Sequence, residues 1–96
     1  NAICTPELQL ACAEGEAFAL LETIKANAKF PTSESINTID GVRVEYADGF
    51  GLARPSNTTP VVVMRFEADS EEAIKRIQAE FKAVLLAAKP EAKLPF

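Results

Sequence analysis

Short runs in which apolar and polar residues alternate predict most of the strands of this chain. The first run covers residues 7–12, where every second side chain is Leu, Leu or Cys. Residues 36–39 and 42–46 flank Asp40-Gly41, a dipeptide that is typical of hairpin turns. A further short run, residues 50–53, follows a second Asp-Gly pair. We therefore expect several short strands joined by tight turns.

The longest strand-like run covers residues 61–68. Val62, Met64 and Phe66 mark one face, and the opposite face begins with two more valines, Val61 and Val63. Because both faces are apolar at the start of the run, we expect a central strand that is covered on both sides there.

Two longer segments change to the helical period. Residues 14–28 carry an apolar stripe that we expect to be buried: Phe18, Leu21, Ile24 and Ala28, with Ala17 and Leu20 beside it. Residues 69–89 carry a second stripe: Ile74, Ile77, Phe81, Val84, Leu85 and Ala88. Asp69 is the expected N-cap of this second helix, with Glu72 completing a capping box, and Pro90 is the expected stop.

The charged residues of the second helix are expected to face solvent: Glu71, Lys75, Arg76, Glu80 and Lys82.

The order of these elements predicts the fold class. One strand, a helix, three or four strands and a second helix, joined by short turns, favour antiparallel pairing. We expect an α+β domain with a mostly antiparallel sheet of four to five strands and two helices packed on one face.

Composition narrows the possible functions. Ninety-six residues form one small domain, and the net charge of −4 disfavours binding to nucleic acid or to anionic membranes. No apolar run approaches the roughly 18 residues of a membrane span, and no retained signal peptide is recognisable, so a cytoplasmic location is expected. The absence of histidine removes Ser-His triads and most zinc sites. Cys4 and Cys12 would lie too far apart on an extended segment for a disulfide, so free thiols are expected.

Polar donors are concentrated in residues 54–60, Arg-Pro-Ser-Asn-Thr-Thr-Pro. A guanidinium offers a planar fork of N–H donors that fits phosphate, and hydroxyls with backbone N–H groups can form an anion-binding concavity. Asn57 tolerates a positive φ, which would help the loop turn its N–H groups inward. The same residue types are typical of an ordinary turn, so both interpretations stay open. The candidate site residues are Arg54, Ser56, Asn57, Thr58 and Thr59.

With its flanks, this loop resembles the C-terminal domain of the α-D-phosphohexomutases, the phosphoglucomutase/phosphomannomutase family. The resemblance rests on residues 40–44 (Asp-Gly-Val-Arg-Val) and on residues 48–60, and it extends from the N-terminal residues to the closing Leu-Pro-Phe. Many members have Gly where this chain has Asn57 and Glu where it has Thr59. The Asn-Thr-Thr version resembles the bacterial bifunctional phosphomannomutase/phosphoglucomutase branch.

The resemblance implies a fold like that of TATA-box-binding protein, with residues 1–96 as one phosphate-binding domain and residues 1–6 as its hinge. It implies that the loop holds the substrate phosphate that is not transferred, with no catalytic residue and no metal ligand in this chain. The full enzyme would use a phosphoserine and Mg²⁺ from other domains and a glucose 1,6-bisphosphate intermediate. Expected partners are a phosphosugar and those other domains, in a monomer. The alternative is a free-standing ligand-sensing or dimerisation module that uses the sheet face around Val61 and Val63.

Overall fold

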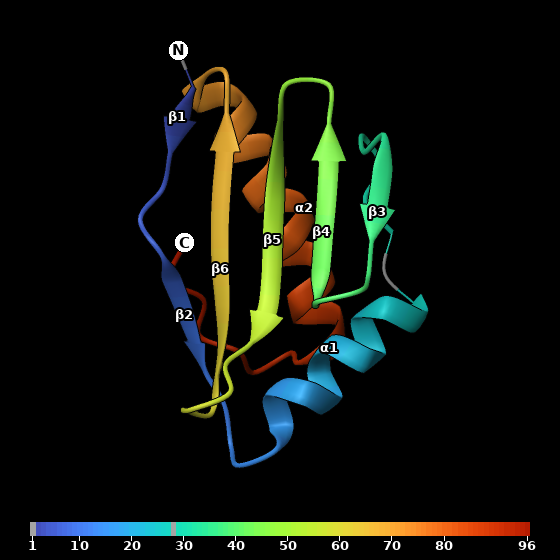
Figure 1. Cartoon of the computed structure of the whole chain (residues 1–96), viewed down its shortest axis with the longest axis vertical. Helices are drawn as coiled ribbons and strands as arrows, with labels where there is room; N and C mark the ends of the chain where they lie inside the picture. Colours follow the sequence, from blue (N-terminus) through green and yellow to red (C-terminus); the bar gives the residue numbers. More distant parts are fainter. Residues whose placement is uncertain (1, 28) are drawn as a thin grey trace.

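The computed structural model describes residues 2–27 and 29–96. Within them lie six strands and two helices in the order β1, β2, α1, β3, β4, β5, β6, α2 (Figure 1). Their bounds are β1 Ile3–Cys4, β2 Leu8–Ala11, α1 Glu16–Asn27, β3 Ser35–Asn37, β4 Val42–Tyr46, β5 Gly49–Pro55, β6 Val61–Ala68 and α2 Glu71–Ala88.

All strand pairs are antiparallel, in the order β1-β6-β5-β4-β3, with β2 also paired to β6. β1 and β2 follow one another along the same edge of β6, where Ile3 pairs with Ala68 and Leu8 with Met64. The described part of the sheet therefore has six strands but is five strands wide. Both helices lie on one side of it (Figure 1), which confirms the α+β class and the expected layers.

The strand bounds differ from the sequence prediction in two places that matter for the site. Ile3–Cys4 forms an unpredicted strand, because this part of the expected hinge pairs with the free edge of β6. β5 is longer than predicted and runs to Pro55, so Arg54 is a strand residue paired with Val63 rather than a loop residue. On the face of β6 that points away from the helices, Val63 is 8% exposed but Val61, nearer the loop, is only half-buried, so the expected cover on both faces is present only in part.

The core lies between the sheet and the two helices. Within it, Phe81 of α2 packs against residues from several segments of the chain. The Phe81 ring is 2% exposed and lies 4.9 Å from the Phe30 ring and 5.1 Å from the Phe66 ring, measured between centroids. Gly51 of β5 faces the same ring, and a Cβ at that position would overlap it. A bare glycine in the middle of the sheet is thus required by the close approach of an aromatic side chain.

Some predictions for the helices are corrected by the structure. The N-cap of α2 is Ser70 and not Asp69, because the Ser70 hydroxyl accepts a hydrogen bond from the Ala73 backbone N–H at 3.1 Å. Phe18 is 53% exposed rather than buried, because the buried stripe of α1 is formed by Ala17, Leu20, Leu21 and Ile24. Ala28 lies outside the described residues.

The burial of the apolar stripe of α2 and the state of the two thiols largely agree with the sequence prediction. Ile74, Ile77, Phe81 and Leu85 are buried as predicted, whereas Val84 and Ala88 are only half-buried at the edge of the core. Helix α2 ends at Ala88, just before Pro90, as predicted. Both cysteines are free thiols.

Two residues expected in solvent, Arg76 and Glu80, instead form a half-buried polar network on α2. The Arg76 guanidinium donates to both carboxylate oxygens of Asp48 and lowers the pKa of that carboxyl. Glu80 accepts from the Tyr46 hydroxyl at 3.0 Å and from the Thr32 backbone N–H. The network ties α2 to the β4–β5 turn and to the segment before β3. Helical periodicity does not reveal it, because the partners are distant in sequence.

Candidate functional site

The loop between β5 and β6 lies at one end of the sheet, beside the start of α1 (Figure 1). Its backbone is closed by the Ser56 N–H, which donates to the Val61 carbonyl at 3.0 Å, and by the Val61 N–H, which donates to the Thr59 carbonyl at 2.8 Å. The Pro60 carbonyl accepts from the Cys12 N–H at 2.8 Å. These bonds attach the loop to β2 as well as to its own strands.

The donors of the loop converge on one point, which the Ser56 hydroxyl oxygen occupies. This oxygen accepts from the backbone N–H groups of Thr58 at 3.3 Å and Thr59 at 3.4 Å, and from the Thr59 hydroxyl at 3.2 Å. The Thr58 hydroxyl lies 3.4 Å away. The two N–H···O distances exceed the usual range of about 2.7–3.2 Å, and the two hydroxyl–hydroxyl distances exceed the usual range of about 2.5–3.0 Å. An anionic oxygen would form shorter, charge-assisted bonds with the same donors.

Asn57 does not adopt the positive φ that was expected to help the loop turn its N–H groups inward. No described residue other than glycine has a positive φ, so the loop turns without placing Asn57 in the left-handed region. The reason is local: the Ser56 side chain accepts from N–H groups two and three residues further on, which forms the turn by itself. Asn57 is exposed at the tip of the loop.

Arg54 is the one guanidinium at this end of the sheet that the structure leaves available to a ligand. Its neighbours Ala53 and Gly51 are buried toward the helices, so strand alternation places Arg54 on the opposite side. Arg43 is paired with Glu45 and Arg76 with Asp48, but within residues 2–27 and 29–96 no carboxylate forms an ion pair with Arg54.

Three hollows adjoin the predicted residues, two of them at the loop and one beside the β3–β4 turn. A hollow of about 110 Å³ is lined by the loop and by the start of α1. A second hollow of about 370 Å³ is lined by Arg54 and Asn57, by Lys25 of α1 and by the turn between β3 and β4. A third hollow of about 320 Å³ is lined by Arg54, by Arg43 and Leu52 and by the turn before β4. Ser56, Thr58 and Thr59 line the smallest hollow, Arg54 lines the other two, and Asn57 lines both hollows at the loop. All five predicted residues therefore lie at one end of the sheet.

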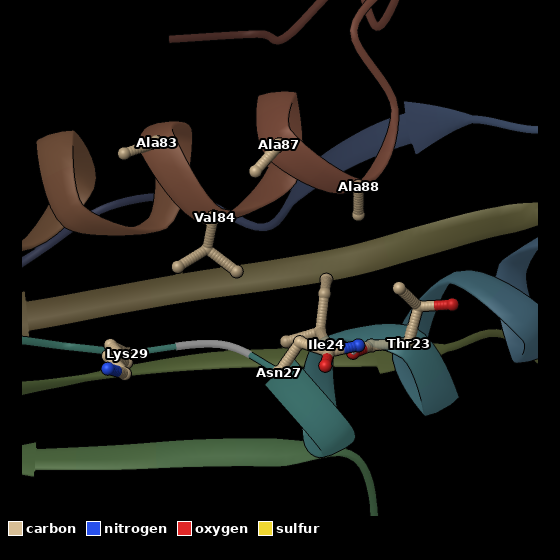
Figure 2. Close-up of a pocket in the computed structure, with 8 residues that line it drawn as sticks. All are labelled: Thr23, Ile24, Asn27, Lys29, Ala83, Val84, Ala87 and Ala88. Atoms are coloured by element: carbon tan, nitrogen blue, oxygen red, sulfur yellow. The ribbon is translucent and has the colours of Figure 1, made fainter.

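A larger hollow of about 540 Å³ lies between α1 and α2, but none of the predicted residues borders it. Its floor is apolar: Val84 and Ala88 of α2 point toward Ile24 of α1 (Figure 2). The only charged side chain that lines it is Lys29. This groove lacks the converging donors of the β5–β6 loop.

Gly41 packs beside the candidate site, although the sequence predicted only that it lies in a turn. Its φ is +113°, and a Cβ added there would lie 2.7 Å from the Arg54 Cβ and 2.9 Å from the Arg54 Cα. The β3–β4 turn therefore packs directly on the backbone that carries the guanidinium. The Asp40-Gly41 pair is visible in the sequence, but its contact with Arg54 depends on the order of strands in the sheet.

We expect Gly41→Ala to weaken oxyanion binding, and Gly15→Ala is the matched control. Both glycines have a positive φ, so alanine strains each backbone by roughly 1–2 kcal/mol. Nothing lies within 4 Å of a Cβ at Gly15, whereas a Cβ at Gly41 must displace Arg54. Urea denaturation should show the larger loss for Gly41→Ala, by about 1–3 kcal/mol more than the control. Phosphate-induced NMR shifts should weaken in Gly41→Ala, and unchanged shifts there would contradict the role of Gly41. Gly15→Ala serves as the control for stability alone, because Gly15 lines the smaller hollow at the loop.

Two further findings bear on the chemistry. Among the described residues, no group of three or more Cys, Asp or Glu side chains gathers as a metal site. None of the described helices combines the length and apolar character needed to cross a membrane.

Comparison with known proteins identifies the family. The family model for "Phosphoglucomutase/phosphomannomutase, C-terminal domain" matches residues 7–84. A phosphoglucomutase from Neisseria meningitidis serogroup B is 54% identical over 86 residues, which cover 88% of this chain and 19% of that protein. A phosphomannomutase/phosphoglucomutase from Pseudomonas putida is 45% identical over 96 residues, which cover 100% of this chain and 20% of that protein.

A solved structure shares the fold as well as the sequence. The crystal structure of a phosphoglucomutase/phosphomannomutase family protein from Burkholderia thailandensis superposes with a TM-score of 0.90 at 57% identity, covering 100% of this chain and 20% of that one. The chain spans about one fifth of the length of these relatives. It belongs to the phosphoglucomutase/phosphomannomutase family, in which it matches the C-terminal domain.

Proposed function

We propose that this chain is the substrate-phosphate-binding domain of a mutase that interconverts hexose 1-phosphate and hexose 6-phosphate. The observation that carries the proposal is the Arg54 guanidinium, which forms no ion pair within residues 2–27 and 29–96, next to a loop whose donors converge on the Ser56 oxygen. A dianionic phosphate has the oxygens and the charge that this arrangement would satisfy.

In this proposal the loop holds the phosphate that is not transferred. Arg54 would bind two of its oxygens through the guanidinium fork. The N–H groups of Thr58 and Thr59 and the three hydroxyls would donate to the phosphate oxygens that face the loop, with the Ser56 hydroxyl turning from acceptor to donor. Asn57 would donate from its exposed side-chain amide. Anchoring the distant phosphate would align the reacting oxygen at the other end of the sugar, so this domain contributes positioning.

The remaining parts of the reaction would come from other domains of the same enzyme, which we expect to be a cytoplasmic monomer. Its relatives are about five times as long as this chain. A phosphoserine there would donate its phosphoryl group to the hexose monophosphate to give the glucose 1,6-bisphosphate intermediate, and the serine would then take a phosphoryl group back from the other position of the sugar. Mg²⁺ there would neutralise phosphate charge when bound. Residues 1–6 would act as the hinge. β1 and the Thr5 N–H, which donates to the Phe66 carbonyl at 2.9 Å, attach this segment to β6.

The alternative, a dimerisation module that uses the open sheet face, has weaker support. Val63 is already 8% exposed within the monomer, so it offers little further area to a partner. Phe50 on the same face lies under the Arg43 guanidinium, 4.1 Å from the ring centroid.

A backbone-amide NMR titration of the 96-residue chain with glucose 1-phosphate tests the proposal. Glucose serves as the control for the sugar, and sulfate reports on the oxyanion alone. We expect shifts at residues 54–59 with the sugar phosphate and none with glucose, at an affinity of roughly 1 mM because one phosphate is held by one domain. Shifts scattered over the chain, or equal shifts with glucose, would contradict a phosphate site in this loop.

A further inference from the structure

Lys25 of α1 is a second cation beside the candidate phosphate site. Lys25 and Arg54 are far apart in the sequence, and the packing of α1 against β5 brings both to the hollow of about 370 Å³. The Lys25 side chain is 26% exposed, so the protein covers most of its aliphatic stem while its ammonium group stays at the surface. Two cations from different elements around one hollow favour an anionic ligand, because an anion between them offsets their repulsion.

Within residues 2–27 and 29–96, the Lys25 ammonium group forms one hydrogen bond. It donates to the Glu22 Oε2 atom at 3.0 Å, one turn earlier in the same helix. The Glu22 side chain is 71% exposed, and solvent screens an ion pair of this kind so strongly that it contributes little to stability. An ammonium group has three N–H donors, so Lys25 can bind a further acceptor or exchange Glu22 for a stronger one.

Other paired cations of the described chain are held more firmly than Lys25. The Arg76 guanidinium donates to both carboxylate oxygens of Asp48. The Lys89 side chain is 16% exposed and forms ion pairs with two carboxylates, those of Glu16 and Glu91. Lys25 has a single, more exposed partner, and it is the paired cation that borders the hollow beside Arg54.

We propose that Lys25 is a second cationic contact of the substrate phosphate, and that Glu22 holds its ammonium group until the phosphate binds. The inference rests on the proposed function for the identity of the ligand. A phosphate between the two side chains receives the planar fork of Arg54 on two oxygens and the point charge of Lys25 on another. The Glu22 carboxylate returns to water at little cost, because most of it is already exposed.

The hollow also supplies a means to separate a specific exchange from a general effect of charge. Two carboxylates border it, Glu22 of α1 and Asp40 of the β3–β4 turn. Both repel a phosphate, but only Glu22 is bonded to Lys25, and Asp40 forms no ion pair within the described part of the chain. Removal of either charge should favour phosphate, whereas only the effect of Glu22 should depend on Lys25.

The first test is an NMR titration of the 96-residue chain with inorganic phosphate. We expect Lys25→Gln to raise the Kd about three- to tenfold, since one charge-assisted contact at a partly exposed site is lost. Lys75→Gln is the matched control, because Lys75 is an exposed helical lysine that does not line the hollow, and its Kd should change less than about twofold. In the wild type, the side-chain ¹⁵Nζ resonance of Lys25 should shift with phosphate and that of Lys75 should not.

A double-mutant cycle tests the exchange with Glu22. Glu22→Gln should lower the Kd about two- to threefold in the wild-type background and leave it unchanged in the Lys25→Gln background. Asp40→Asn, which keeps a residue suited to the turn, should lower the Kd equally in both backgrounds. An effect of Glu22→Gln that is the same in both backgrounds would overturn the exchange.

The outcomes distinguish this inference from the proposed function. Phosphate shifts at residues 54–59 with an unchanged Kd in Lys25→Gln would overturn the contact and leave the proposed function standing. A wild-type chain that binds no phosphate contradicts the proposed function, and kinetics of the full-length mutase then decide on Lys25. There we expect Lys25→Gln to raise the KM for glucose 1-phosphate about three- to tenfold with kcat changed less than about twofold, the result of losing a contact made equally before and during the reaction. An unchanged KM would overturn the contact.

Discussion

Arg54→Ala is expected to lower kcat/KM of the full-length mutase by about 100-fold, with a higher KM and a lower kcat. The variant would remove the two charge-assisted hydrogen bonds to phosphate that we propose, each worth about 1.5–3 kcal/mol. Because about 1.4 kcal/mol corresponds to a factor of ten, the lower end of this range gives about 100-fold. The free energy of unfolding should change by less than about 0.5 kcal/mol, because the side chain is exposed and forms no ion pair within the described chain. Steady-state kinetics and urea denaturation measure the two effects.

Two further variants sharpen this result. Arg54→Lys keeps the charge but loses the planar fork, so we expect an intermediate loss of about tenfold. Arg65→Ala is the matched control: Arg65 is also exposed on a strand of the same sheet, but it lines neither hollow at the loop. A similar loss in Arg65→Ala would mean that the effect reflects overall charge. Full activity in Arg54→Ala would remove Arg54 from the site.

Phe81→Ala is expected to reduce the free energy of unfolding by about 3–5 kcal/mol, the usual cost of truncating a buried phenylalanine. The ring is 2% exposed, packs against Phe30 and Phe66 and fills the space that Gly51 leaves open. Alanine would leave a cavity where the middle of the sheet meets α2. Urea denaturation of the 96-residue chain followed by circular dichroism measures the loss.

Phe18→Ala is the control for that measurement. Its side chain is 53% exposed, so the loss should stay below about 1 kcal/mol. If Phe81→Ala does not fold at all, Phe81→Leu should still fold, with a cost of about 1–2 kcal/mol. Equal costs for Phe18→Ala and Phe81→Ala would contradict the core described above.

Local patterns in the sequence were sufficient to predict both helices and most strands, and to find the candidate loop. The period of two in residues 61–68 and the period of 3.6 in residues 71–88 are visible because each face of these elements meets one environment. The loop could be found because Arg54, Ser56 and the threonines are close in sequence and therefore close in space. Family membership follows from a match over residues 7–84, which include this loop.

Tertiary structure decided the rest, because it brings together residues that are far apart in sequence. Phe18 repeats with the period of the α1 stripe, yet it is exposed because α1 packs on the sheet through Ala17, Leu21 and Ile24. Gly41 could be recognised as a turn residue, but its packing against Arg54 requires β4 to pair with β5. The sequence by itself thus determined the helices, most strands and the donors of the loop. Only the order of strands and the packing of α1 decided what surrounds those donors, since these depend on contacts between distant segments.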